Sequence, residues 1–157
     1  MDILKELDSS KMNLKEIKAI SIIGLGYVGL PLAFEFSKKY NVVGYDINSK
    51  RVNELNKGID STNEVDKNIL DDFGKKSNIY NIKFTTNKKD IAKSNVYILT
   101  VPTPIDNVKN PNLEPLKQAS KIVSQFLKSN NNFEIDKSID NKLLISVAPD
   151  GYLKRIR

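Results

Sequence analysis

Three glycines in the segment 24–29 (GLGYVG) constrain the fold more than any other feature of this sequence. They directly follow a β-branched run at residues 19–23, and an amphipathic stretch begins a few residues later. In a strand-turn-helix unit, the first glycine permits a tight turn and the second lets the backbone approach a phosphate group. The third lets the helix pack closely on the strand. The spacing therefore predicts a phosphate-binding turn at Gly24, Gly26 and Gly29.

Short β-branched runs alternate with amphipathic stretches along the chain, which is typical of βαβ units and a parallel sheet. We expect strands over residues 19–23, 41–45, 82–85, 96–101 and 143–147. We expect helices over residues 32–39, 49–57 and 116–127, with a weaker helix over 66–75. In the helix at 116–127, an apolar stripe at helical spacing is expected to face the core rather than a ligand; it consists of Ala119, Ile122, Val123 and Phe126.

The length of the chain limits the number of domains. A chain of 157 residues, 39% of them hydrophobic, can bury one core but hardly two. The fold class expected is therefore α/β, a Rossmann-like doubly wound and mostly parallel sheet in a single three-layer domain. We expect this domain at residues 19–128, preceded by an N-terminal extension at 1–18. Residues 129–157 are expected to be a divergent, truncated C-terminal segment.

An acidic residue ends the second expected strand. Asp46 lies 22 residues after Gly24, close to the roughly 20 expected for the acid that binds the ribose hydroxyls of a dinucleotide. A carboxylate there favours NAD over NADP, because it would repel a 2′-phosphate. Arg51, one helical turn further on, could accommodate a phosphate, but beside Asp46 we interpret it as a partner of the adenosine ribose. The alternative is that the glycine turn and the strand-end acid occur together by chance.

A second candidate segment is Val101-Pro102-Thr103-Pro104, which follows the fourth expected strand at its carboxyl end. Open α/β sheets bind their ligands at that edge. The two prolines favour a rigid, extended loop, so Thr103 could offer its hydroxyl and N–H to a cofactor at little entropic cost. The alternative is a plain turn stiffened by proline.

Composition excludes several kinds of site. The chain has no cysteine and no histidine, so disulfides, thiolate chemistry and imidazole metal sites are absent from it. The net charge of +6 comes from scattered lysines without interleaved aromatic residues, so we expect no nucleic-acid partner. We expect no membrane span, and residues 1–18 lack the apolar stretch of a secretory signal, so we expect a cytoplasmic protein.

Four segments resemble the N-terminal domain of the UDP-glucose/GDP-mannose dehydrogenase family; they are residues 23–33, 43–55, 100–104 and 111–113. Within that family the chain is most similar to the UDP-N-acetylhexosamine 6-dehydrogenases of surface-polysaccharide synthesis, the Vi-type enzymes among them. The resemblance spans residues 17–128. It implies oxidation of the C6 alcohol of a UDP-sugar to a carboxylate with two molecules of NAD. It also implies NAD contacts at Tyr27, Val28, Asp46, Arg51 and Thr103.

The family resemblance also implies parts that this chain does not contain. The family's chemistry uses a cysteine from a second domain, and its Glu-Ser-Thr-x-x-Pro-Gly segment is only loosely echoed at residues 145–151. We therefore expect NAD binding without turnover, no catalytic or metal-binding residue in this chain, and UDP-sugar binding only if a substrate domain is supplied. Two alternatives stay open: a non-catalytic or vestigial NAD-binding domain, and a Rossmann dehydrogenase of the 3-hydroxyacid or 6-phosphogluconate type.

Overall fold

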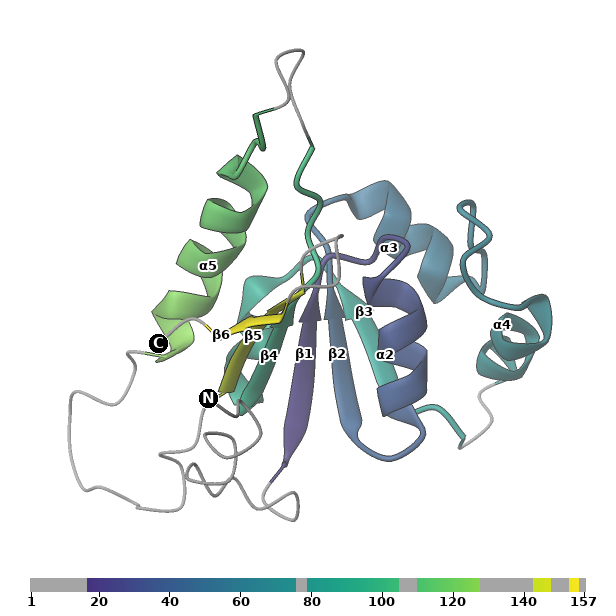
Figure 1. Ribbon diagram of the computed structural model, residues 1–157. Coiled ribbons are helices and arrows are strands. Elements are labelled where there is room, and N and C mark those ends of the chain that lie inside the picture. Colours follow the sequence, from purple (N-terminus) through teal and green to yellow (C-terminus); the bar gives the residue numbers. More distant parts are fainter. Residues whose placement is uncertain (1–16, 76–78, 105–109, 128–142, 148–152, 156–157) are drawn as a thin grey trace, which may run out of the picture.

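The computed structural model describes residues 17–75, 79–104, 110–127, 143–147 and 153–155. One six-stranded sheet in the order β3-β2-β1-β4-β5-β6 forms its centre (Figure 1). Neighbours from β3 to β5 pair in parallel, and β6 pairs antiparallel with β5. The strands are β1 Ala19–Ile23, β2 Asn41–Tyr45, β3 Ile82–Thr85, β4 Val96–Leu99, β5 Leu143–Val147 and β6 Leu153–Arg155.

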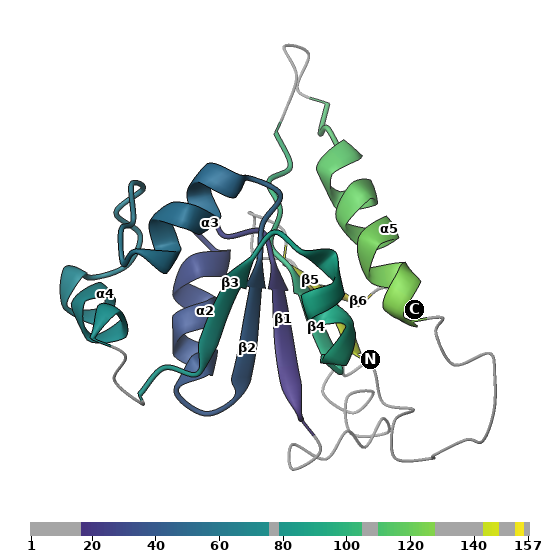
Figure 2. The same cartoon turned by 180° about the vertical axis from the view of Figure 1, so that it is seen from behind.

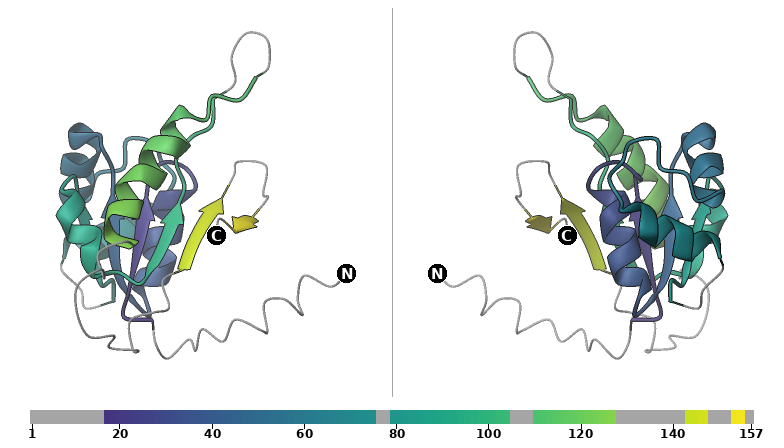
Figure 3. Two further views of the ribbon diagram at one scale, coloured as in Figure 1. Left: turned by 90° about the vertical axis from the view of Figure 1, so that its left-hand side faces the viewer. Right: turned by 90° about the vertical axis from the view of Figure 1, so that its right-hand side faces the viewer.

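The five expected strands are confirmed, with one difference in length. The strand expected over 96–101 ends at Leu99, although the N–H of Thr100 still donates to Ile23 O at 2.8 Å. Beyond it the chain continues through Pro102, which has no N–H to offer a neighbouring strand. The short strand β6 was not predicted, and with β5 it extends the sheet past residue 128. In Figure 3 these two strands lie at the edge of the sheet.

The helices divide between two core clusters. In chain order they are α2 Gly29–Ser37, α3 Ser49–Asn56, α4 Lys67–Gly74, the 3₁₀ helix η2 Lys88–Lys93 and α5 Glu114–Leu127. α2, α3 and α4 pack into one cluster, and η2 and α5 pack into the other. Views from the two sides show α2 before the sheet in Figure 1 and behind it in Figure 2. The single three-layer α/β domain is thus confirmed, whereas the 3₁₀ helix was not predicted.

Side chains at the helix starts explain the helix boundaries. The side chain of Asn48 accepts a hydrogen bond from the N–H of Arg51 at the start of α3, and Asp66 accepts one from Asn68 at the start of α4. Such caps satisfy backbone donors that have no partner inside the helix. Gly58, with a φ of +72°, follows the end of α3 in the left-handed conformation that glycine adopts without strain.

The strand order fixes where a ligand can approach. The connections β1-α2-β2 and β2-α3-α4-β3 build the sheet outwards from β1, and the chain then returns to place β4 on the other side of β1. The connections after β1 and β4 therefore leave the sheet in opposite directions. A crevice opens between them at the carboxyl ends of the strands, as in Rossmann folds. In the part of the chain described, no helix is long and apolar enough to cross a membrane.

Candidate dinucleotide-binding site

A cavity of about 450 Å³ lies at the carboxyl ends of the central strands. Residues 24–26 after β1, residues 46–48 after β2 and residues 100–102 after β4 line it. This is the switch point of the sheet, where ligands of this fold class bind. The sequence predicted the turn after β1, the acid after β2 and the loop after β4, and the structure brings all three to one cavity.

Helix α5 supplies another wall of the cavity. Ala119 and Ile122 line it, while Ala119 and Val123 are buried and Phe126 packs against the same core cluster. The prediction that this stripe faces the core rather than a ligand was therefore only half right. Helical periodicity identifies a buried face but cannot say whether protein or ligand covers it.

The three glycines occupy three different environments. Gly24 has a φ of +98°, and a Cβ there would come within 3.0 Å of the Thr100 carbonyl oxygen. At Gly29 a Cβ would collide with the carbonyl oxygen of Gly24 and the hydroxyl of Thr100. At Gly26, which lines the cavity, a Cβ would meet nothing within 4 Å. Turn geometry thus requires Gly24, packing of α2 requires Gly29, and the backbone at Gly26 is open to the cavity.

Thr100 holds the first part of the glycine turn. Thr100 is buried, and the carbonyl oxygens of Ile23 and Gly24, at 3.0 and 2.7 Å, share the single hydrogen of its hydroxyl. The Gly24 N–H in turn donates to the Tyr45 carbonyl oxygen at 2.8 Å. The sequence gave no signal for this role of Thr100, because its partners are 76 and 77 positions away.

Asp46 binds the same turn from the side of β2. Its Oδ2 accepts the Leu25 N–H at 2.8 Å, and its Oδ1 accepts the Asn48 N–H at 2.8 Å. Each carboxylate oxygen keeps a second lone pair, and Asp46 lines the cavity. Burial, helped by the negative charge of Asp46, raises the pKa of the neighbouring Tyr45.

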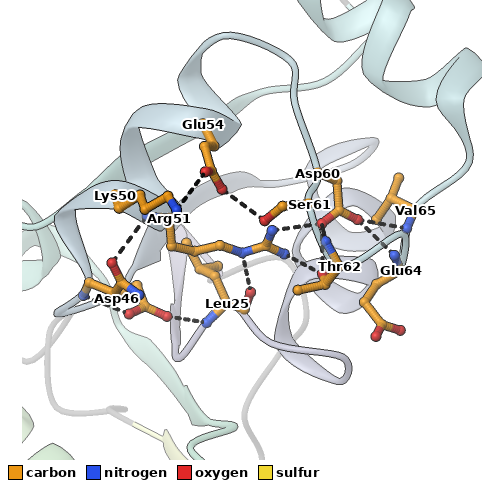
Figure 4. A network of polar contacts seen from close by, with 11 residues as sticks. Leu25, Asp46, Lys50, Arg51, Glu54, Asp60, Ser61, Thr62, Glu64 and Val65 are labelled. Carbon is orange, nitrogen blue, oxygen red and sulfur yellow. Dashed lines mark hydrogen bonds and ion pairs between the residues drawn. The ribbon is translucent and has the colours of Figure 1, made fainter.

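Arg51, predicted as a partner of the adenosine ribose, lines the cavity, and the ribose contact stays a prediction. Although it borders the cavity, its guanidinium is buried and holds three protein oxygens (Figure 4). Nε donates to the Leu25 carbonyl oxygen at 3.0 Å, Nη1 to Asp60 Oδ1 at 2.6 Å and Nη2 to Thr62 Oγ1 at 2.9 Å. The arginine thereby connects the glycine turn to the loop after α3.

Asp60 is the buried counter-charge of Arg51, and no sequence pattern pointed to it. The N–H and hydroxyl of Thr62 donate to Oδ1, and the N–H groups of Glu64 and Val65 donate to Oδ2. Burial acts to raise the pKa of Asp60, but the hydrogen bonds from Thr62, Arg51 and Glu64 outweigh it and hold the pKa at about 2. The carboxylate therefore stays ionised beside the guanidinium.

The other predicted residues lie outside the cavity lining. Tyr27 is 54% exposed, Thr103 is partly buried, and Val28 is the N-cap of α2. No side chain caps this helix at Val28, and its first turn holds no acidic residue. Its N-terminal end, which carries partial positive charge, is therefore available to an anion. Among the described residues, no group of His, Cys, Asp or Glu is arranged to hold a metal ion.

Comparison with known proteins agrees with this geometry. Residues 18–139 match the UDP-glucose/GDP-mannose dehydrogenase family, NAD binding domain. The chain belongs to this family. NAD is therefore its cofactor. The family match also excludes the alternative of a dehydrogenase of the 3-hydroxyacid or 6-phosphogluconate type, whereas the non-catalytic NAD-binding domain stays open.

Individual members of the family differ in their sequence identity to this chain. UDP-N-acetyl-D-glucosamine 6-dehydrogenase from Pseudomonas aeruginosa is 50% identical over 115 residues, which cover 73% of this chain and 26% of that protein. The Salmonella typhi protein of the same name is 47% identical over 71% of this chain and 25% of its own length. The structure of UDP-D-ManNAc dehydrogenase from Pyrococcus horikoshii superposes with a TM-score of 0.64 at 30% identity, covering 83% of this chain and 28% of that one. The chain thus spans about a quarter of the length of these relatives.

Substituting two of the glycines separates packing from cofactor binding. Gly26→Ala is expected to change the free energy of unfolding by no more than about 1 kcal/mol, because its Cβ meets open space. It should nevertheless weaken NAD binding at least about tenfold, if the pyrophosphate approaches the backbone at Gly26 as the glycine spacing predicts. Gly29→Ala is expected to cost about 1–3 kcal/mol of stability through overpacking. Urea unfolding measures the stability, and calorimetric titration measures NAD binding. A larger loss of stability in Gly26→Ala than in Gly29→Ala would contradict the roles given to these two glycines.

The depressed pKa of Asp60 gives the stability a defined pH dependence. Because the folded-state pKa of about 2 lies below the ordinary 3.8, ionised Asp60 stabilises the fold above that ordinary value. This contribution is lost as the pH falls towards the folded-state pKa. The stability difference between the wild type and Asp60→Asn should therefore shrink by about 2 kcal/mol between about pH 6 and about pH 2. Urea unfolding at each pH measures this difference in the free energy of unfolding, with Glu35→Gln on the surface as the control. A difference that does not change with pH would contradict the buried ion pair.

Proposed function

We propose that this chain is the NAD-binding domain of an enzyme that oxidises the C6 alcohol of a UDP-N-acetylhexosamine to the uronate, for surface-polysaccharide synthesis. Asp46 carries the cofactor part of the proposal, because its carboxylate holds the glycine turn and also borders the cavity. The names of the Pseudomonas aeruginosa and Salmonella typhi relatives support the substrate class. The cytoplasmic location expected from the sequence stays a prediction.

The cavity fits the parts of NAD one by one. The open backbone at Gly26 and the uncapped start of α2 suit the pyrophosphate. The free lone pairs of Asp46 suit the adenosine ribose hydroxyls. Ile47, 73% exposed beside Asp46 at the cavity, offers an apolar surface for the adenine ring. Contacts from Tyr27, Val28, Arg51 and Thr103, implied by the family resemblance, stay predictions.

The redox step divides between this chain and the rest of the enzyme. NAD held in this cavity would supply the oxidant for C6 of the sugar. Oxidation of the alcohol to the carboxylate would consume two molecules of NAD and one of water and would release two NADH and three protons. Covalent catalysis at that carbon requires an activated nucleophile, and this chain contains neither cysteine nor histidine. The role proposed for the described residues is to bind and orient NAD, while a substrate domain provides the nucleophile and the UDP-sugar site.

The absence of cysteine and histidine also supports a second candidate function. A domain that binds NAD without any chemistry of its own would show the same fold and the same cavity. The distinction lies in whether the chain transfers hydride when a substrate domain is present.

The preference for NAD tests the cofactor part of the proposal. We expect NAD to raise the melting temperature of the chain more than NADP does, because a ligand that binds only the folded state stabilises it by mass action. In Asp46→Asn the amide oxygen still accepts one N–H, but the charge that repels a 2′-phosphate is gone. NAD should therefore bind more weakly to this variant, and the shifts in melting temperature that NAD and NADP cause should become more alike. Equal shifts for the two cofactors in the wild type would refute the role of Asp46.

Mixing the chain with a separate substrate domain tests the enzyme part. The partner is the Pseudomonas aeruginosa relative without its NAD-binding domain, and the substrate is UDP-N-acetylglucosamine. We expect NADH to accumulate, as followed by absorbance, only when both proteins are present, and Gly26→Ala should suppress it. NAD binding without any NADH formation would instead support the non-catalytic candidate.

A further inference from the structure

Arg51 is the only cationic side chain among the described residues that line the cavity. It borders this space together with Asp46, the acid at the end of β2. In dinucleotide sites, an arginine close to that strand end is the group that accommodates the 2′-phosphate of NADP. Asp46 favours NAD, whereas an arginine at the position of Arg51 is a residue type that could also accommodate NADP.

The structure resolves this conflict through the loop after α3. Asp60 and Thr62 hold the two terminal nitrogens of Arg51 at 2.6 and 2.9 Å. Figure 4 shows the guanidinium pointing towards this loop, on the side away from Asp46. The side chains of Arg51 and Asp60 are only 8% and 1% exposed. A guanidinium paired in this way has little positive charge to offer a ligand phosphate.

We propose that Asp60 is a specificity-determining residue, which selects NAD over NADP by keeping the Arg51 guanidinium away from the adenosine 2′ position. The proposal rests on the NAD-binding function given above. Asp60 touches no cofactor atom itself and acts through Arg51.

The loop is built to hold this carboxylate in place. Four hydrogen bonds from Thr62, Glu64 and Val65 fix both oxygens of Asp60, so the anion is anchored before it meets the guanidinium. Another acid close to this network is Glu54, which faces Lys50 and accepts a hydrogen bond from Ser61. Removing the Asp60 charge would leave a buried arginine without a counter-charge. That state is strongly unfavourable, so the side chain would turn to another anion.

A bound 2′-phosphate would be such an anion, since arginine pairs with phosphate through two parallel hydrogen bonds. Nε of Arg51 also holds the Leu25 carbonyl oxygen, so the same movement would loosen the glycine turn. NAD should then bind more weakly while NADP binds more tightly. A purely structural role of Asp60 would weaken both cofactors by the same factor, so the ratio of the two dissociation constants distinguishes the roles.

The test measures dissociation constants of NAD and NADP by calorimetry, on the whole chain and its variants. We expect Asp60→Asn to lower the ratio of the NADP constant to the NAD constant at least about tenfold, which corresponds to about 1.4 kcal/mol. Glu54→Gln, which removes a neighbouring carboxylate that does not contact Arg51, should leave the ratio unchanged. In the double variant Asp60→Asn/Arg51→Ala, the gain in NADP affinity should disappear.

Three results would overturn the proposal: an unchanged ratio in Asp60→Asn, the same fall in Glu54→Gln, or an NADP gain that survives without Arg51. If Asp60→Asn does not fold, Thr62→Val replaces it, because it removes one partner of Arg51 and keeps the Asp60 charge. A smaller decrease of the ratio is then expected in Thr62→Val. An unchanged ratio in this variant would overturn the proposal. If the wild type binds neither NAD nor NADP, the proposed function itself is contradicted. This result is distinct from the three above, which contradict only the role of Asp60.

Discussion

One residue of the glycine turn, Leu25, is held through both of its backbone polar groups, and the shape of the whole site depends on it. Asp46 accepts the N–H of Leu25, and Arg51 donates to its carbonyl oxygen. Both side chains come from the β2–α3 unit, so the turn after β1 is fixed by the next unit along the chain. A turn of glycines is otherwise free to adopt many conformations, and its preorganisation reduces the entropic cost of binding.

The fold could be predicted from the sequence because its signals are local. Hydrophobic runs located the strands, and the glycine spacing located the turn between β1 and α2. The acid Asp46 could be assigned because its distance from Gly24 along the chain is set by one βα unit. The strand β6 escaped prediction because it has only three residues, too few for a periodic pattern. The 3₁₀ helix is a six-residue element and escaped for the same reason.

The roles of Arg51 and Asp60 could not be predicted, because they depend on which groups meet in space. The sequence predicts Arg51 near the ribose because the residue follows the strand-end acid closely, and no pattern in the sequence predicts that Arg51 pairs with Asp60. The structure shows that the two charges pair inside the protein. An ion pair across a loop has no periodicity and no fixed spacing. The distinction between an arginine that binds a ligand and one that binds its own protein appears only in three dimensions.

Helix α5 uses one face for two purposes, since Ala119 belongs to the core and to the cavity wall. The packing of this helix on β4 and the reception of a ligand are therefore not independent events. A molecule seated in the cavity completes the apolar surroundings of α5 and ties the helix to the turn after β1 on the other side of the crevice. Occupancy of the site and the attachment of α5 to the sheet are consequently linked equilibria, and each favours the other.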